Sequence, residues 1–320
     1  MAKRRLTKQQ RQRIKDNQTH QTLTTAFSGE QHEGLVIAHY GADIDIEDPE
    51  GVVHRCHLRQ NIAPMVVGDR VVWHKVPDNR GVVTAVLPRR SSLMRYDPQG
   101  LQKLVAANVD QIIVTCAVEP LFSTFLLDCY LAAAALTGID AVIVLNKIDL
   151  LDDAALEDVK QQLHPYEQLG YQVTLLSSQD TTNINALSSA LDQHASVFVG
   201  QSGVGKSSLI QHFVTSSRLA VNEISTQQKL GRHTTTTSRL YHLADGGDII
   251  DSPGVREFGL GRIEPQQLFD AFIEFKPLQG ECKFRNCLHQ TEPHCALKAA
   301  LEAGDVDASR MASFRKLLGS

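Results

Sequence analysis

The sequence predicts a multidomain chain, in which a small N-terminal β-barrel precedes a central α/β domain and a mainly α C-terminal domain. Three observations support this fold class. Short β-rich runs, separated by Gly, Asp, Asn and Pro, fill residues 34–90. From residue 108 onward, apolar strand-like runs alternate with helical patterns, which is typical of a parallel sheet covered by helices. Three of the six cysteines are crowded into residues 282–295, which marks a separate small module.

The composition limits where the protein works and what it meets there. Its 320 residues carry a net charge of −4, so the overall charge does not indicate a nucleic-acid partner. The sequence contains no secretory signal pattern and no apolar run of membrane-spanning length, and its scattered cysteines form no secreted disulfide framework. We therefore expect a reduced, cytoplasmic protein with no membrane partner, and a monomer as the simplest state.

The N-terminal segment 1–33 departs from this average charge. Residues 1–20 contain seven Lys or Arg and one acid, Asp16, which gives a local charge of +6. A polar, Gln-rich basic segment cannot bury a core, so we expect an arm that is disordered on its own. Such an arm suits RNA phosphates, or it serves only to keep the chain soluble.

The β-rich region predicts a five-stranded OB-like barrel over residues 34–92. Barrels of this kind often bind RNA on one face, and the alternative is a barrel that serves only as a docking surface. Because aromatic residues are few, shape and phosphate contacts are favoured over base stacking. The candidate RNA contacts are basic residues and a single stacking ring: Arg59, Arg70, Trp73, His74, Lys75 and Arg80.

The most informative motif of the α/β region is G-Q-S-G-V-G-K-S, which starts at Gly200. A short apolar strand, residues 196–199, precedes it and a helix starting at Ser208 follows, which is the context of a phosphate-binding P-loop. Lys206 is expected to reach the β- and γ-phosphates, and the Ser207 hydroxyl to bind Mg²⁺. The residues expected to contact nucleotide here are Gly200, Gln201, Ser202, Gly203, Val204, Gly205, Lys206, Ser207 and Ser208.

A second motif, N-K-I-D at Asn146 to Asp149, follows the predicted strand 141–145 and has the chemistry of guanine recognition. The Asp149 carboxylate can accept hydrogen bonds from N1–H and the 2-amino group of guanine, a pair that adenine lacks. Asn146 can hold the base edge and the neighbouring loop, and the stem of Lys147 can cover the ring. Ser177 and Ser178 follow the predicted strand 171–176, where a backbone N–H would meet guanine O6.

Two further segments fit the parts of a nucleotide switch. D-S-P-G, Asp251 to Gly254, ends a predicted strand, so that Asp251 would hold Mg²⁺ through water and the Gly254 N–H would contact the γ-phosphate. The threonine-rich loop 231–237 precedes it and would supply a second Mg²⁺ ligand. Spacing does not decide between Thr235 and Thr236. The alternative is a plain turn into a strand at residues 238–243.

The order of these motifs is unusual. Ordinary small GTPases carry N-K-x-D and the serine loop last, whereas here they come first, as in a circularly permuted chain. The D-x-x-G segment therefore leads through residues 255–281 into the C-terminal module. We expect the nucleotide state to move that module.

The cysteine-rich module contains C-x4-C-x-H-x5-C, formed by Cys282, Cys287, His289 and Cys295. Three thiolates and one imidazole suit one closed, structural Zn²⁺ site. His294 is a rival ligand, although its adjacency to Cys295 makes joint ligation awkward. Helices are expected at residues 296–302 and 308–318, with basic side chains available for RNA: Lys298, Arg310, Arg315 and Lys316.

These motifs together, in this reversed order, closely resemble the RsgA (YjeQ) family of circularly permuted GTPases that depend on the small ribosomal subunit. The resemblance runs from about Gly34 to the C-terminal helices. It implies an OB-fold domain, a permuted GTPase domain and a zinc domain. From the sequence pattern we place these at 34–92, 108–260 and 261–320, with a linker at 93–107. The resemblance also implies binding to the 30S subunit and its 16S rRNA during late maturation, stimulation of GTP hydrolysis by that subunit, and a checking or factor-release role. Other 30S assembly factors are further candidate partners.

The expected activity is GTP hydrolysis to GDP and phosphate, with Lys206 and Thr235 in catalytic positions. A water-orienting Gln often follows D-x-x-G, but Val255 stands there, so intrinsic turnover should be slow. The resemblance implies that His233 takes part in catalysis. GTP would favour docking, and hydrolysis would favour release. The alternatives are an RNA-docking GTP/GDP sensor with negligible turnover and an ATP-dependent kinase, which Asn146 and Asp149 disfavour.

Overall fold

A computed structural model describes residues 30–41, 43–58, 62–76, 80–96, 101–177, 181–220, 237–252, 258, 260, 261 and 263–319. The chain divides into two compact units, one up to Arg89 and one from Arg90 onward, and each is described by itself. Most of the expected basic arm lies outside the described residues. Its last part does not, because the first strand already begins at Gln31.

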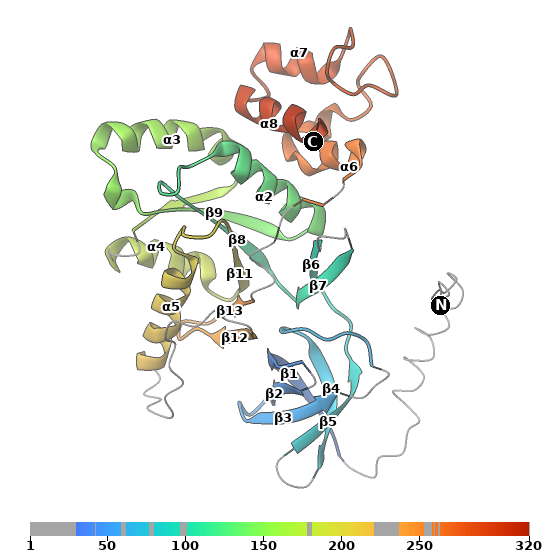
Figure 1. Cartoon of the computed structure of the whole chain (residues 1–320), viewed down its shortest axis with the longest axis vertical. Coiled ribbons are helices and arrows are strands. Elements are labelled where there is room, and N and C mark those ends of the chain that lie inside the picture. The colour runs from blue at the N-terminus through green and yellow to red at the C-terminus, as the bar shows by residue number, and fades with distance from the viewer. Residues whose placement is uncertain are drawn as a thin grey trace. The chain divides into compact units, whose positions relative to one another are not determined.

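The first unit is the expected five-stranded barrel (Figure 1). Its strands pair in the order β1-β2-β3-β5-β4, and an additional β1–β4 pairing closes the sheet on itself. Only the β3–β5 pair is parallel. This topology confirms the prediction of an OB-like barrel. The strands are β1 (Gln31–His39), β2 (Asp43–Glu47), β3 (Val53–Leu58), β4 (Arg70–Val76) and β5 (Arg80–Val86).

Trp73, which the sequence suggested as a stacking ring for RNA, lies in the core of the barrel. It is 1% exposed and packs among apolar residues such as Val36, Ile44 and Val83. Its indole Nε1 donates to the carbonyl of Glu33 (3.3 Å), which satisfies the buried N–H. His74 is also buried. Neither ring is placed to meet a base, so this expectation was wrong for both.

In the second unit, the strands lie in the order β10-β9-β8-β11-β13-β12, and all neighbours are parallel except β12 and β13. Strand β11, which leads into the P-loop, pairs with β13 on one side and with β8 on the other. The carboxyl ends of these strands therefore meet at one edge, where ligands bind in open α/β sheets. The strands are β8 (Gln111–Ala117), β9 (Asp140–Asn146), β10 (Gln172–Leu175), β11 (Ala195–Val199), β12 (Ser238–His242) and β13 (Asp248–Asp251).

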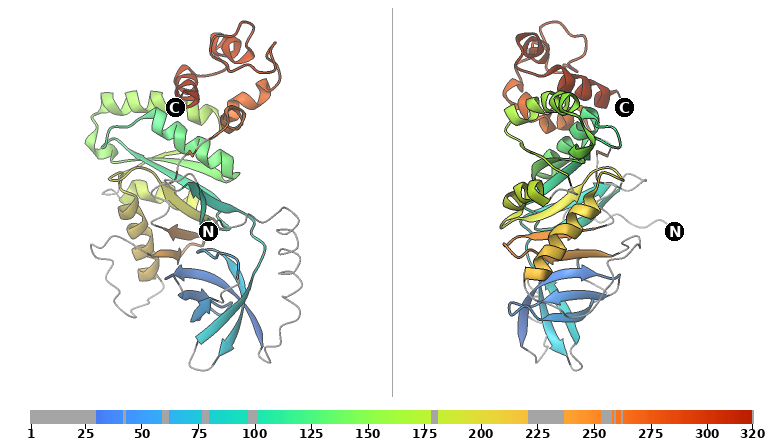
Figure 2. Two further views of the ribbon diagram at one scale, coloured as in Figure 1. Left: turned by 45° about the vertical axis from the view of Figure 1, so that its right-hand side comes forward. Right: turned by 90° about the vertical axis from the view of Figure 1, so that its left-hand side faces the viewer.

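Helices cover both faces of this sheet (Figures 1 and 2). Helices α4 (Thr181–Leu191) and α5 (Lys206–Ala220) share one core cluster with β8, β9, β11 and β13. Helices α2 (Thr124–Thr137) and α3 (Asp153–Gln168) lie on the other face. Among the described residues, no helix is both long enough and apolar enough to cross a bilayer.

Residues 93–107, expected to act as a linker, carry an antiparallel hairpin. It is formed by β6 (Ser92–Tyr96) and β7 (Gln102–Ala107). Leu93, Ala106 and Ala107 are fully buried at its base. The sequence gives little sign of this hairpin, because both strands are short and neither has a strictly alternating pattern.

The C-terminal module packs against helix α2. Its core joins phenylalanines 269, 272, 275 and 314 with Ala132 of α2, and α6 and α8 both contact that helix (Figure 2). The module contains α6 (Pro265–Ala271), the 3-10 helix η3 (Ile273–Leu278), α7 (Ala296–Ala303) and α8 (Ala308–Leu318). Arg310, which the sequence offered for RNA contact, is 1% exposed. That expectation was wrong for Arg310, since its charge is used inside the protein.

Candidate functional site

The P-loop joins β11 to the start of α5, and two of its glycines are required by close backbone approach. Gly200 has a φ of 137°, and a Cβ there would lie 2.0 Å from the carbonyl oxygen of Thr115. Gly205 has a φ of 97°, and a Cβ there would lie 2.1 Å from Nδ2 of Asn146. Any other residue would push the loop away from β8 and β9. The P-loop therefore packs closely against the ends of β8 and β9.

Lys206 lies in the first turn of α5 and folds back over the loop. Its Nζ donates to the carbonyls of Gly200 (2.7 Å) and Gln201 (2.5 Å). Ser202, Gly203 and the hydroxyl-bearing pair Ser207 and Ser208 are exposed, whereas Val204 is buried. The N-terminus of α5 and the exposed loop therefore face solvent, where an anion can approach the backbone N–H groups.

Asn146 ends β9 and is fully buried. Its Nδ2 donates to the carbonyl of Val204 (2.9 Å), and its Oδ1 accepts from the backbone N–H of Lys147 (2.8 Å). Lys147 has a φ of 66°, and its Nζ donates to the carbonyl of Glu119 (2.7 Å). These bonds tie the N-K-I-D loop to the P-loop. Asp149 is exposed in the short 3-10 turn η1 (Ile148–Leu150), so its carboxylate can meet a base.

The serine segment after β10 is linked to the same loop. The N–H of Leu176 donates to Leu145 (2.9 Å), and the N–H of Ile148 donates to the carbonyl of Leu176 (3.4 Å). Ser177 follows directly and is 2% exposed. Ser178 lies outside the described residues.

Asp251 ends β13, beside the P-loop strand, and the register pairs Ile250 with Val197 of β11. The next residue, Ser252, shares a 2.7 Å hydrogen bond with the hydroxyl of Ser238 at the start of β12. Asp251 therefore reaches the same carboxyl edge as the P-loop. The other predicted switch residues lie outside the described part of the chain: His233, Thr235, Thr236 and Gly254.

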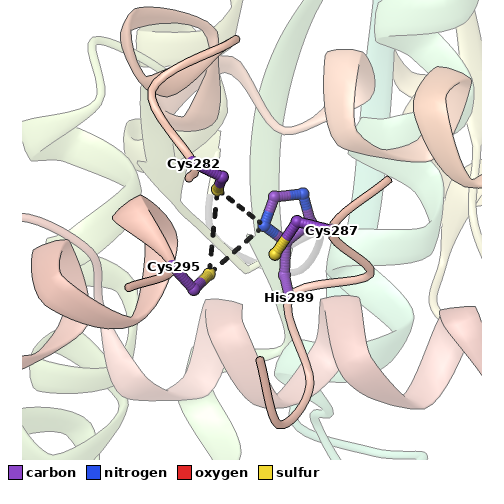
Figure 3. A group of neighbouring side chains, drawn as sticks. All are labelled: Cys282, Cys287, His289 and Cys295. Atoms are coloured by element: carbon purple, nitrogen blue, oxygen red, sulfur yellow. Dashed lines mark hydrogen bonds between the residues drawn. The ribbon is translucent and has the colours of Figure 1, made fainter. Parts of the chain in front are cut away.

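The four predicted zinc ligands converge in the C-terminal module (Figure 3). Nδ1 of His289 lies 3.6 Å from Sγ of Cys282 and 3.4 Å from Sγ of Cys295, and the two sulfurs are 4.0 Å apart. Zn–S bonds of about 2.3 Å and Zn–N bonds of about 2.0 Å in a tetrahedron require ligand separations of about 3.5–3.8 Å. All four ligand atoms, including Sγ of Cys287, lie within 4.8 Å of one another. The set therefore fits a tetrahedral zinc ion. His294 is exposed and is not part of the group.

Surrounding groups hold these ligands in place. The ring of Phe269 stacks on His289 with centroids 4.9 Å apart, and burial lowers the pKa of that imidazole, which favours the neutral form that binds metal. The N–H of Ala296 donates to Sγ of Cys282 (3.4 Å). The Glu292 carboxylate accepts from three backbone N–H groups of the ligand loop, and these bonds lower its pKa.

The contacts that sequence reasoning missed are mostly made by the backbone. The carbonyls of Val204 and Glu119 accept hydrogen bonds from Asn146 and Lys147, yet every residue type has a backbone carbonyl, so the sequence does not mark these acceptors.

Cys116 lies at the end of β8 beside the P-loop, and burial raises the pKa of its thiol to about 12. It is therefore protonated and unreactive at neutral pH.

The fold and site together define a class of protein. A P-loop between β11 and α5, an N-K-x-D loop after β9 and Asp251 at the end of β13 meet at one edge of a mostly parallel sheet. This is a P-loop GTPase with a circularly permuted chain.

Comparison with known proteins identifies the family. The family model described as RsgA GTPase matches residues 86–261. "Small ribosomal subunit biogenesis GTPase RsgA" of Chromohalobacter salexigens is 45% identical, covering 99% of this chain and 98% of the relative. Its counterpart from Pseudomonas aeruginosa is also 45% identical, covering 100% and 98%. The chain belongs to the RsgA GTPase family.

Solved structures agree with this assignment. The crystal structure of YjeQ from Thermotoga maritima has a TM-score of 0.74 and 32% identity, covering 90% of this chain and 98% of that one. YloQ, described as a circularly permuted GTPase, has a TM-score of 0.72 and 27% identity, covering 92% and 96%. The permuted order read from the motifs is therefore confirmed.

Replacing Asp149 by Asn is expected to weaken GDP binding about a hundred-fold or more, because two hydrogen bonds to a charged acceptor contribute about 1.5–3 kcal/mol each. The amide can instead donate to the 2-carbonyl of xanthine, so affinity for xanthosine diphosphate should rise. Titration calorimetry with both nucleotides measures this. Asp153→Asn, an exposed acid four residues further on, is the control and should leave both affinities unchanged. Equal GDP affinity in Asp149→Asn and the unaltered chain would remove Asp149 from the base site.

Proposed function

We propose that this protein binds the 30S ribosomal subunit and hydrolyses GTP to GDP and phosphate during late maturation of that subunit. GTP favours docking, and hydrolysis favours release. The observation that carries the proposal is the hydrogen bond between the guanine loop and the P-loop, Asn146 to Val204, in a chain whose relatives are named small ribosomal subunit biogenesis GTPases. A site that joins base and phosphate recognition in this way is built for GTP and GDP.

Each residue of the nucleotide site has a role in this proposal. The N–H groups of the P-loop surround the phosphates, and Lys206 leaves its carbonyl partners to reach the β- and γ-oxygens. Ser207 and Asp251 have the oxygen donors that Mg²⁺ prefers, and a bound Mg²⁺ would neutralise phosphate charge. Thr235 supplies a further Mg²⁺ ligand, Ser177 and Ser178 border guanine O6, and the Gly254 N–H contacts the γ-phosphate.

The C-terminal cluster holds one structural Zn²⁺ in this account. Its three thiolates and one imidazole complete a tetrahedron and leave no position for a reacting water. The exposed basic residues near this module, Arg315 and Lys316, and those of the barrel, Arg70, Lys75 and Arg80, suit 16S rRNA phosphates. We place the protein in the cytoplasm as a monomer, where other 30S assembly factors are candidate partners.

Cosedimentation tests the docking step directly. The protein loaded with a non-hydrolysable GTP analogue should pellet with 30S subunits at least about ten-fold more tightly than the GDP form, the range expected for a nucleotide-controlled equilibrium. Equal pelleting in both states would overturn the release step. An RNA-docking sensor would show the same difference without multiple turnover, so the assay is paired with phosphate release.

His233 is proposed to position the attacking water, because Val255 replaces the usual glutamine. His233→Ala should lower the ribosome-stimulated kcat about a hundred-fold, as for loss of one transition-state contact, and leave GDP affinity unchanged. Single-turnover hydrolysis and nucleotide titration separate the two effects. His164→Ala, an exposed histidine of α3 outside the proposed chemistry, should change neither. An unaltered kcat in His233→Ala would exclude this histidine from the mechanism.

A further inference from the structure

Arg310 links the C-terminal module to the nucleotide-binding part of the second unit. It lies in α8, and its guanidinium forks onto Glu274 of η3, with Nε to Oε1 at 2.7 Å and Nη2 to Oε2 at 2.9 Å. Its third donor, Nη1, reaches Oδ1 of Asp128 in α2 at 2.6 Å. All three side chains are at most 5% exposed. One buried cation therefore bridges the module and helix α2.

The cluster extends to a second helix. The Tyr166 hydroxyl of α3 donates to the same Asp128 oxygen (2.7 Å), and the guanidinium lies 4.4 Å from the ring centroid of Phe272. Although burial opposes its charge, the two carboxylates raise the pKa of Arg310, so the guanidinium stays charged. Buried charges of this kind are stable only in one well-defined geometry, because each lost partner leaves an unpaired charge.

The first turns of α2, which carry Asp128, also border the P-loop. Residues of its first turns, among them Leu126 and Tyr130, line a small cavity together with Gln201 and Val204 of the P-loop. The loop that enters α2 accepts the hydrogen bond from Lys147, through the carbonyl of Glu119. Helix α3 follows the N-K-I-D loop along the chain. Helix α2 carries Asp128, and helix α3, which follows the N-K-I-D loop, reaches the same residue through Tyr166.

We infer that helix α2 and the cluster of Asp128, Glu274, Arg310 and Tyr166 couple occupancy of the guanine site to the C-terminal metal module. This connection is additional to the covalent one that runs from the D-S-P-G segment into the module. This second connection begins at the base-binding loop and the P-loop, so bound GDP is sufficient to affect it and no γ-phosphate is needed. The inference rests on the proposed nucleotide site. Because coupling is reciprocal, a partner that fixes the module also changes nucleotide affinity.

Hydrogen exchange of the full-length, metal-loaded chain with and without GDP tests the inference. Segments 265–278 and 308–318 should exchange about ten-fold more slowly with GDP, within the range of typical coupling between sites. Unchanged exchange in both segments, at a GDP concentration where binding is saturated, would overturn the inference alone. If the chain does not bind GDP at all, the proposed function fails as well, which distinguishes the two failures.

Two variants assign the coupling to the cluster. Asp128→Asn keeps the shape of the side chain but removes its charge, and Tyr166→Phe removes one donor with little risk to folding. Both should bind GDP yet lose most of the GDP-induced protection, with Asp128→Asn losing more. Lys276→Met is the control, because Lys276 is an exposed charge of the same module, on η3, and lies outside the cluster. It should keep the full effect. Full GDP-induced protection in Tyr166→Phe and in metal-loaded Asp128→Asn would overturn the role of the cluster.

Discussion

Replacing Lys206 by Met is expected to lower kcat for GTP hydrolysis about a hundred- to a thousand-fold, as for the loss of one group that stabilises transition-state charge. The ammonium group lies at the P-loop, 2.7 Å from the carbonyl of Gly200, and an anion on the loop would draw it toward the phosphates. Methionine keeps most of the side-chain length and its apolar contacts but carries no charge. Acid-quenched GTP cleavage under single-turnover conditions measures the chemical step without interference from product release.

A matched control separates this effect from a general loss of positive charge. Lys160→Met removes an exposed lysine of α3 whose partner is Glu157, at 3.7 Å, so kcat should be unchanged. If Lys206→Met hydrolyses GTP as fast as Lys160→Met, the P-loop does not support catalysis and the proposed enzyme is wrong.

Replacing Cys287 by Ser is expected to abolish stoichiometric zinc binding and to unfold the ligand loop of the C-terminal module. Structural zinc sites contribute about 10–16 kcal/mol of binding free energy at pH 7, and this free energy is coupled to folding. The loop between Cys282 and Cys295 contains no regular helix or strand, so few other contacts can hold it. Metal analysis should fall from one zinc per chain to none, and hydrogen exchange of residues 282–295 should approach that of an unfolded segment.

The control for this substitution is Cys129→Ala. Cys129 lies half-buried in α2, where burial raises the pKa of its thiol to about 11, and it is not one of the four zinc ligands. Its loss should leave one zinc per chain. A Cys287→Ser chain that still holds one zinc, with unchanged exchange in its loop, would contradict the tetrahedral assignment.

The parts that the sequence predicted well are those whose chemistry is local. The P-loop, the N-K-I-D loop and the cysteine cluster can each be recognised from a short stretch of sequence. The order of the nucleotide motifs indicates the permuted topology, in which β11 lies between β13 and β8. Buried parallel strands give continuous apolar runs, so the positions of these strands could also be predicted from the sequence. The short helix α6 was missed because seven residues provide fewer than two full helical periods of pattern.

Burial of polar or amphipathic residues could not be predicted in the same way. A tryptophan followed by His74 and Lys75 in a predicted strand and an arginine in a basic helix both have the composition of an RNA surface. The structure instead closes the barrel over Trp73 and surrounds Arg310 with Asp128 and Glu274, which lie 182 and 36 residues away in the chain. Such long-range pairing leaves no local signal, since charged residues are usually exposed.

The measurement that tests the central claim most directly is steady-state GTP hydrolysis by the full chain, alone and with purified 30S or 50S subunits. We predict slow turnover by the chain alone, because Val255 stands where a water-orienting glutamine often lies, and selective acceleration by 30S subunits. Acceleration should disappear in Lys206→Met. Tight GTP binding with no acceleration by either subunit would contradict the account and favour a GTP/GDP sensor.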